Sequence, residues 1–241
     1  GGATLPKPVG QWSFDEGQGT VANNSGVGTS INGTLTNMAS PATSTSGWNQ
    51  TGKINKAISF DGSNDYINVS SPSGLSGFSS GTVMAWVYIN EFQGSACNTH
   101  NGLTTGMAIL FSHDYGFFFG INSDGALIMD MGNDSGWQTI DNTQAGVLTK
   151  NRWHHITVVP HDGTTIDYYV DGVKVDSNTV SYTTFNDGNT NTLKIGRHFN
   201  VSNSQFKGLL DDVKIYNYAR TPAQIAYDYN KGKPVAHYRF D

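Results

Sequence analysis

The chain has 241 residues, of which 37% are hydrophobic, 12% aromatic and 14% charged, and its formal net charge is −5. It is too aromatic and too weakly charged for a disordered chain, and its scattered Lys and Arg form no basic stripe for nucleic acid. No apolar run approaches the roughly 20 residues of a membrane helix, so we expect neither nucleic-acid binding nor membrane insertion.

The composition also indicates where the protein works. A chain rich in Asn, Thr, Ser and Gly and poor in charge is typical of secreted and cell-surface proteins. Its one cysteine, Cys97, cannot form an internal disulfide. We therefore expect an extracellular or cell-surface location.

Strands are expected wherever apolar and polar residues alternate between turn dipeptides. The segments with this pattern are 56–62, 65–70, 82–90, 116–132, 153–177, 191–196 and 208–219. Asp-Gly pairs at 162–163 and 171–172 predict hairpin turns, and the near-continuous apolar run 82–90 predicts a strand covered on both faces. The segments 38–52 and 93–106 are expected to be the loops best suited to function.

Only one helix is expected, near the C-terminus. Thr221 suits the N-cap, Pro222 the first helical position and Gln224 the capping box, and Gly232 supplies a stop. About ten strands, frequent turns and one short helix predict an all-β fold, a two-sheet antiparallel β-sandwich of the jelly-roll type.

Several motifs follow one another along the chain in a recognisable order. They are WSFDEGQGTV, NGTL, GKINKAISFDGSNDYI, AWV, WHHI, YVDG, LKIG and GLLDDVKIYNYA. Together they resemble the laminin-G-like, concanavalin A-like jelly-roll domains of bacterial surface and secreted proteins, over about 9–231. The resemblance implies two curved antiparallel sheets whose first and last strands are neighbours, with 1–8 as an extension and 232–241 as a linker and further strand.

Domains of this family act mostly as binding modules, in glycan recognition, in adhesion or as appendages to hydrolases, and some bind calcium. The resemblance places a calcium ligand at Asp211, with oxygen atoms from the loop after the first strand, where Asn23 replaces the commoner aspartate. An amide oxygen in place of a carboxylate weakens a site for a hard cation. A structural calcium ion is one expectation, and the other is that Asp211 only caps backbone N–H groups.

The strand pattern gives two aspartates a core-facing position. Asp211 shares the parity of Leu209 and Val213, and Asp65 shares that of Ile67. An unpaired buried carboxylate is costly, so each is expected to be hydrogen-bonded, ion-paired or metal-bound.

Neither histidines nor glutamates suggest catalysis. His154 and His155 are neighbours on a strand and point to opposite faces, so a satisfied core histidine is expected rather than a metal site. Glycosidases that share this sandwich need two carboxylates flanking the scissile bond, usually on one strand as Glu-x-Asp-x-x-Glu. The only glutamates, Glu16 and Glu91, form no such motif, and we expect no enzyme activity.

Aromatic residues outside the core pattern are candidates for a glycan site. Trp48, Tyr115 and Trp137 each have Asn, Asp or Gln beside them. A sugar packs its C–H face on a ring while its hydroxyls bind polar groups. The alternative for each ring is a buried loop anchor, since tryptophan is usually largely buried.

The two ends of the chain repeat each other. Residues 233–241, KPVAHYRFD, match residues 7–15, KPVGQWSFD, at five of nine positions. The side chains of residues 233–241 alternate in the pattern of an amphipathic strand. An edge strand without a partner tends to pair with another strand. It can begin a second domain, pair head-to-tail with a neighbouring molecule, fold back on its own sandwich, or be a coincidence. The residues expected to carry such assembly are Val235, His237, Tyr238 and Phe240.

Together these features predict a non-catalytic extracellular module of a repetitive cell-surface or filament-forming protein. It would act in adhesion or assembly, with a glycan or surface protein as its partner and possible head-to-tail self-association. The alternative is a carbohydrate-binding module attached to a secreted glycan-degrading enzyme.

Overall fold

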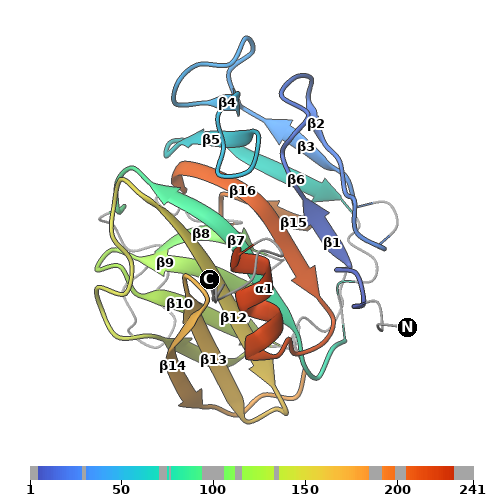
Figure 1. Ribbon diagram of the computed structural model, residues 1–241, viewed down its shortest axis with the longest axis vertical. Helices are drawn as coiled ribbons and strands as arrows, with labels where there is room; N and C mark the ends of the chain where they lie inside the picture. The colour runs from blue at the N-terminus through green and yellow to red at the C-terminus, as the bar shows by residue number, and fades with distance from the viewer. Residues whose placement is uncertain are drawn as a thin grey trace, which may run out of the picture.

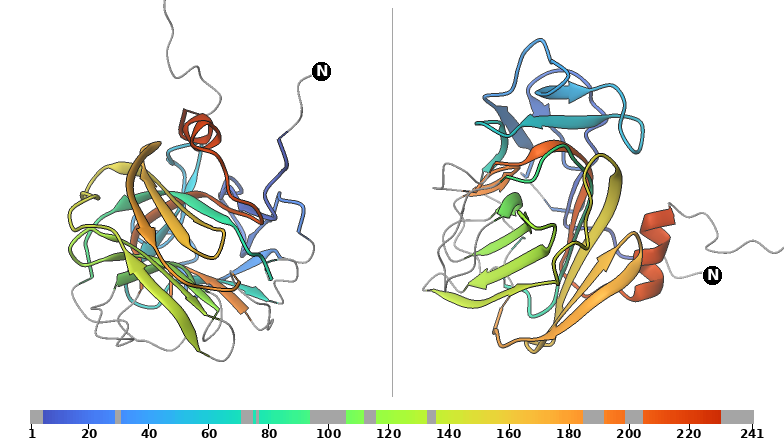
Figure 2. Two further views of the ribbon diagram at one scale, coloured as in Figure 1. Left: turned by 90° about the horizontal axis from the view of Figure 1, so that it is seen from below. Right: turned by 90° about the vertical axis from the view of Figure 1, so that its left-hand side faces the viewer.

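The computed structural model describes residues 5–28, 31–70, 75, 77–93, 106–111, 116–132, 136–184, 192–198 and 205–230. Over these residues the chain forms sixteen β-strands, in two eight-stranded antiparallel sheets, and one helix. The sheets lie face to face and the helix lies outside them (Figure 1, Figure 2). The predicted β-sandwich with one short helix is confirmed.

Sheet A is built from both ends and the middle of the chain. Its strands, in spatial order, are β14 (Val173–Thr179), β13 (Thr165–Val170), β12 (Trp153–His161), β7 (Thr82–Ile89), β16 (Lys207–Tyr216), β5 (Ala57–Asp61) and β4 (Gly47–Asn49), and β1 (Gly10–Trp12) also pairs with β16. The first and last strands are therefore neighbours, as the resemblance implied.

Sheet B takes the remaining strands. In spatial order they are β11 (Trp137–Asn142), β10 (Leu127–Gly132), β9 (Phe117–Asn122), β8 (Gly106–Phe111), β15 (Thr192–Ile195), β6 (Tyr66–Ser70), β3 (Gly33–Thr36) and β2 (Val21–Ala22). The short strands β2 and β4 lie at the same end of the sandwich, at the top of Figure 1.

The hairpin turns follow the predicted chemistry. Asp162, Gly163, Asp171 and Gly172 have positive φ angles of 60°, 67°, 52° and 79°. Two consecutive residues with φ above zero match the twist of the flanking strands, and Asp-Gly pairs tolerate this conformation. The meander β12–β13–β14 is thus set by local sequence.

The core lies between the two sheets, and β7 illustrates how alternation supplies it. Val83, Ala85 and Val87 belong to the main apolar cluster, whereas Met84 and Trp86 point to the outer face of sheet A. Both sets are buried: the first lies between the sheets, and on the outer face the Trp86 ring is covered by Lys53 and by Tyr229 of the helix, which lies outside sheet A (Figure 2). The prediction that this strand is covered on both faces is confirmed.

Helix α1 (Pro222–Asn230) is fixed at its start by the predicted capping box. The backbone N–H of Thr221 donates to Gln224 Oε1 at 2.9 Å, and the N–H of Gln224 donates to Thr221 Oγ1 at 3.3 Å. Ile225 is its buried residue and packs on Val159 and Tyr169 of sheet A. The helix is therefore attached to the sandwich by a small apolar contact of its own.

Unbroken alternation along β16 predicts a core-facing Asp211, and the structure corrects this. The pairing of β16 with β7 shifts after Asp211, and Asp212 has a positive φ of 47°. Such a β-bulge inserts an extra residue and changes the parity of the strand. Leu210 faces the core in place of Leu209, and Asp211 lies opposite Trp86 on the outer face of sheet A.

Candidate functional site

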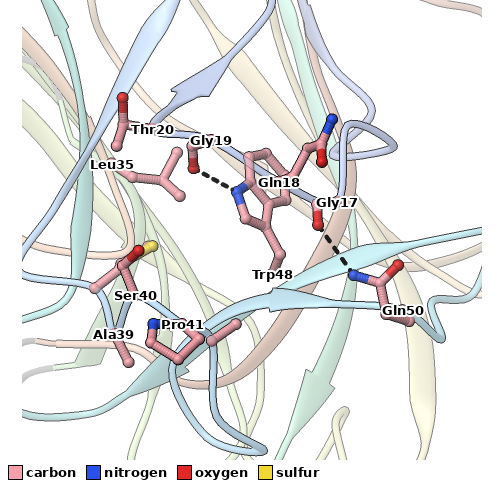
Figure 3. A pocket seen from close by; sticks show the side chains of 12 residues that line it. Gly17, Gln18, Gly19, Thr20, Leu35, Ala39, Ser40, Pro41, Trp48 and Gln50 are labelled. Carbon is pink, nitrogen blue, oxygen red and sulfur yellow. Dashed lines mark hydrogen bonds between the residues drawn. The ribbon is translucent and has the colours of Figure 1, made fainter.

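A cavity of about 340 Å³ lies at the end of the sandwich formed by β2, β3 and β4. Its walls come from three separate segments: residues 17–20 before β2, residues 38–42 after β3, and β4 with the following Gln50. Leu35 of β3 completes the lining (Figure 3). The predicted loop 38–52 therefore does line a pocket, although it contains the short strand β4.

Trp48 of β4 is the aromatic residue of this cavity. Its side chain is almost enclosed, with 7% of the residue exposed, and its indole N–H donates to the carbonyl oxygen of Gly19 at 2.7 Å. Figure 3 shows the ring beside residues 17–19, with Ser40 and Pro41 across the opening. Trp48 thus anchors the loop 17–20, as expected for a buried loop anchor. It also lines a cavity, which a glycan-binding ring requires.

The loop 17–20 is held from two sides. Gln50 Nε2 donates to the carbonyl oxygen of Gly17 at 3.0 Å, and Leu35 N–H donates to that of Thr20 at 2.8 Å. Gly17 has a φ of 69°, and a Cβ there would lie 2.5 Å from Lys56 Nζ. Glycine at this position lets the chain pass close to Lys56 with a left-handed backbone.

The opposite loop is held by buried polar contacts. The backbone N–H of Ala39 donates to Ser46 Oγ at 2.9 Å, and Ser46 also hydrogen-bonds the carboxylate of Asp65. Asp65 is buried, as predicted, and accepts the N–H of Asp61 at 3.1 Å. Burial raises the pKa of the Asp65 carboxyl, although these hydrogen bonds oppose the shift.

The lining combines apolar and neutral polar groups. Apolar surface comes from Trp48, Leu35 and Met38, whereas Gln18 and Ser40 are exposed and supply an amide and a hydroxyl. None of the twelve lining residues has an ionisable side chain. A cavity of this kind suits an uncharged ligand with both C–H surface and hydroxyl groups.

Of the other two aromatic candidates, Trp137 is not among the residues that line this cavity. Trp137 begins β11, at the far edge of sheet B from β2. Tyr115 lies outside the described residues, as do the C-terminal repeat with Val235, His237, Tyr238 and Phe240, and most of the segment 93–106. The proposed roles of these residues stay predictions.

The two predicted calcium ligands make hydrogen bonds to different partners. Asn23 donates through its backbone and side-chain N–H groups to Glu16 Oε1, at 2.6 and 3.0 Å. Asp211 is fully buried, and its Oδ2 accepts the N–H of Ile54 at 2.7 Å. Among the described residues, no cluster of three or more His, Cys, Asp or Glu could hold a metal ion. Any calcium here would depend mainly on carbonyl and amide oxygens, and it stays a prediction.

The histidine pair is accounted for by packing. His154 and His155 point to opposite faces as predicted, but both are buried. His154 contacts Thr149 and the carboxylate of Asp171, and His155 lies against the Trp86 ring with centroids 5.0 Å apart.

Among the described residues, neither Glu91 nor the two carboxyls of Asp130 and Asp141 have the arrangement that glycoside hydrolysis requires. Lys207 hydrogen-bonds Glu91 and lowers the pKa of its carboxyl, the wrong direction for a general acid. Burial raises the pKa values of Asp130 and Asp141. Asp141 lies opposite the core residue Met129, whereas Asp130 points away from the core, so these two carboxyls lie on opposite faces of sheet B.

Sequence reasoning missed Gln18, Ser40 and Gln50 as lining residues. The available signal was their neighbours: a Gly-x-Gly run at 17–19 and the Ser-Pro pair at 40–41 indicate shaped loops. Nothing in the sequence, however, indicates that these loops meet over Trp48, because the segments are up to about thirty residues apart.

Comparison with known proteins gives a family and several similar folds. A family model described as the concanavalin A-like lectin/glucanases superfamily matches residues 61–226, more than half of the chain. No curated protein sequence matches significantly. No helix among the described residues is long and apolar enough to cross a membrane.

Three solved structures illustrate the similarity. Domain 4 of an extracellular GH43 arabinanase from Geobacillus stearothermophilus, solved with arabinotriose, has a TM-score of 0.66 at 23% identity, covering 92% of this chain and 98% of that one. The binding domain of Paraclostridial Mosquitocidal Protein 1 has a TM-score of 0.66 at 19% identity, covering 93% of this chain and 52% of that one. The botulinum neurotoxin serotype G binding domain has a TM-score of 0.64 at 14% sequence identity, covering 93% of this chain and 51% of that one. This chain spans about half the length of the two toxin domains.

Proposed function

Because this chain belongs to the concanavalin A-like lectin/glucanase superfamily, we propose that it is a non-catalytic extracellular module that binds a neutral glycan in the cavity beside Trp48. The observation that carries the proposal is the lining of this cavity, which joins an aromatic ring to amide and hydroxyl groups without an ionisable side chain. None of the lining residues carries a cationic side chain that could pair with an acidic or phosphorylated ligand. The Lys56 ammonium beside Gly17 donates to the carbonyl oxygen of Glu16 at 3.4 Å.

The chemistry of sugars fits this lining. A pyranose or furanose ring packs its C–H face on apolar surface, here offered by Trp48 and Leu35, and its hydroxyls need polar partners such as Gln18 and Ser40 at the rim. The volume of about 340 Å³ lies at the lower end of the range for small-molecule sites, so the end of a glycan fits better than a long internal stretch.

The wider role has two candidates. Adhesion or assembly in a repetitive surface protein was the first expectation from the sequence. Attachment to a secreted glycan-degrading enzyme now has more support, because the similar arabinanase domain is covered almost completely and was solved with a trisaccharide. In both roles the module binds a glycan and another part of the assembly does the remaining work.

Calorimetric titration with arabinotriose and a panel of neutral and acidic oligosaccharides tests the proposal. We expect at least one neutral oligosaccharide to bind and the acidic ones not to. Trp48→Phe should weaken binding at least about tenfold, equivalent to about 1.4 kcal/mol. Trp86→Phe, on the helix-covered face, is the matched control and should leave the Kd unchanged. Equal affinity of wild type and Trp48→Phe for the bound sugar would contradict the site.

A further inference from the structure

The first strand occupies a well-defined site on sheet A, which we call the β1 slot: the edge of β16 at residues 213–215. Gly10, Gln11 and Trp12 pair in register with Ile215, Lys214 and Val213. Val9 N–H extends the pairing by donating to the carbonyl oxygen of Ile215 at 2.8 Å.

Side chains of the first strand are core residues rather than surface additions. Val9, Trp12 and Phe14 are all buried in the main apolar cluster, and Trp12 and Phe14 have no exposed surface. The indole N–H of Trp12 donates to the carbonyl oxygen of Ile31 at 3.0 Å. A sandwich without a strand in this slot would therefore expose a large part of its core.

The C-terminal repeat has apolar or aromatic residues at the positions that this slot buries. Aligning 233–241 with 7–15 places Val235 on Val9 and Phe240 on Phe14, both identities, and Tyr238 on Trp12. Of the four substitutions, one exchanges an aromatic ring for another, two fall at the half-buried positions of Gln11 and Ser13, and one replaces the buried Gly10 by alanine.

One pair of differences is compensated in space. A Cβ at Gly10 would lie 2.8 and 2.9 Å from two atoms of the six-membered ring of Trp12, too close for an alanine. The repeat has Ala236 in place of Gly10 and Tyr238 in place of Trp12. Tyrosine lacks the fused second ring, so the two clashing atoms are absent, and its hydroxyl is still a hydrogen-bond donor.

Polar positions are also chemically matched. Gln11 donates through Nε2 to Asp212 Oδ1 at 3.0 Å, and the repeat has His237 there, whose ring N–H can donate. Asp15 accepts the backbone N–H of Lys56 at 3.2 Å, and the repeat again has an aspartate, Asp241. Each polar contact of the slot thus has a chemical equivalent in the repeat.

From this fit we propose that the β1 slot also accepts residues 233–241 of a second copy of the chain as a substitute first strand. The slot of this sandwich is filled by its own residues 9–14, and residues 233–241 are a second segment whose sequence suits the same slot. Donation of this second segment from one copy to the next would be a head-to-tail contact.

Emptying the slot in the 241-residue chain tests this. Trp12→Ser with Phe14→Ser removes the anchors of the resident strand, and the matched quadruple variant adds Tyr238→Ser and Phe240→Ser. We expect the double variant to unfold at a Tm at least about 10 °C above that of the quadruple variant, to elute as a dimer or larger species, and to gain stability with protein concentration.

Each alternative result contradicts the proposal. Equal Tm values for the two variants, whether both fold or neither does, would mean that 233–241 cannot fill the slot. A double variant that is more stable than the quadruple but stays monomeric at all concentrations would mean that the strand serves its own copy.

The steric compensation is measured separately within β1 itself. Gly10→Ala alone should lower the Tm by several degrees because of the clash with Trp12. In the background of Trp12→Tyr the same alanine should have little effect. Equal losses in both backgrounds would remove the argument that Ala236 and Tyr238 suit this slot together.

Discussion

Trp48 and Trp86 lie on strands of the same sheet and are both nearly enclosed, with 7% and 2% of their surface exposed. Their surroundings differ. The ring of Trp86 is covered by the Lys53 ammonium, 4.6 Å from its centroid, and by Tyr229, 5.5 Å away. Trp48 borders a cavity instead. The exposed fraction alone therefore does not separate a structural ring from a candidate binding ring, whereas the neighbours of each ring do.

The two regions also differ in charge. Beside α1, Lys214 forms ion pairs with Asp212 at 2.8 Å and Asp228 at 3.5 Å, and Asp228 also pairs with Arg220. The Trp48 cavity has no ionisable lining residue. The helix-covered face is thus held by ion pairs and packing, whereas the cavity loops are held by hydrogen bonds, one set of which leads through Ser46 to the buried carboxyl of Asp65.

Truncating each tryptophan should produce the largest effects and separate the two roles. We expect Trp86→Ala to lower the free energy of unfolding by about 3–5 kcal/mol, because it removes a buried ring with its contacts. Trp48→Ala should have a smaller effect on stability but abolish glycan binding. Denaturant unfolding and calorimetric titration of both variants check this. Loss of sugar binding in a folded Trp86→Ala would contradict a purely structural role for Trp86.

Removing the carboxylate of Asp228 beside the helix should have the second-largest effect on stability. Asp228→Ala leaves Arg220, whose side chain is 2% exposed, and Lys214 without their shared carboxylate. We expect a loss of about 3 kcal/mol in denaturant unfolding, because an uncompensated buried charge is costly. Glu91→Ala, which removes an exposed partner of Lys207, is the control and should leave stability nearly unchanged. A similar loss of unfolding free energy in Asp228→Ala and Glu91→Ala would contradict the difference expected between a buried and an exposed ion pair.

Calcium, if bound near Asp211 as the resemblance implied, would bring a charge to the outer face of sheet A, where Asp211 lies opposite Trp86. A ligand that binds only the folded state, present at 100 times its Kd, stabilises by about 2.7 kcal/mol. We therefore expect a chelator to lower the Tm of the wild-type chain and to leave that of Asp211→Asn unchanged. A wild-type Tm that is the same with chelator and with added calcium would remove the metal.

Asp130 gives a smaller effect that depends on pH. Asp130 is 3% exposed, its Oδ1 has no hydrogen-bond partner among the described residues, and burial raises the pKa of its carboxyl well above the usual value. The folded chain then binds more protons than the unfolded chain between the two pKa values, so stability falls as pH rises through that window.

Asparagine at this position cannot ionise. We expect Asp130→Asn to be more stable than wild type near neutral pH by about 1 kcal/mol. The difference should shrink as the pH falls below the folded-state pKa of Asp130. Thermal unfolding over a pH series measures this, with the exposed Asp124→Asn as control. A constant difference at every pH would mean that ionisation of Asp130 is not its cause.

The smallest expected effect comes from removing one amide at the rim of the cavity, that of Gln18. Gln18→Ala should weaken sugar binding about fivefold to tenfold, the value of one hydrogen bond, without changing the Tm. Gln144→Ala, an exposed glutamine outside the cavity, is the matched control. Wild-type affinity should change less than about twofold with added salt, because no charge takes part. A strong salt dependence would contradict an uncharged site.

Much of the fold was predictable because it is encoded locally. Alternation located the long strands, the Asp-Gly pairs at 162–163 and 171–172 fixed two hairpins, and Thr221 with Gln224 fixed the start of α1. Strands of two or three residues, such as β2 and β4, are too short to show a period. The bulge that turns Asp211 outward also has no local signature, since it follows from pairing with β7.

The candidate site was predictable only in part. Trp48 was identified from the polar residues beside it, but its enclosed ring and its bond to Gly19 depend on loops distant in sequence. The same pattern of reasoning selected Trp137, which lies at the far edge of the other sheet. A composition of aromatic and amide residues indicates sugar chemistry without indicating which loops meet.

The indole N–H signals of the five tryptophans test the central claim most directly. In a two-dimensional NMR titration with a neutral oligosaccharide that binds, the Trp48 signal, identified from its loss in Trp48→Phe, should shift most, while those of Trp12 and Trp86 stay in place. A saturable shift confined to other indoles, with Trp48 unmoved, would contradict a glycan site in this cavity.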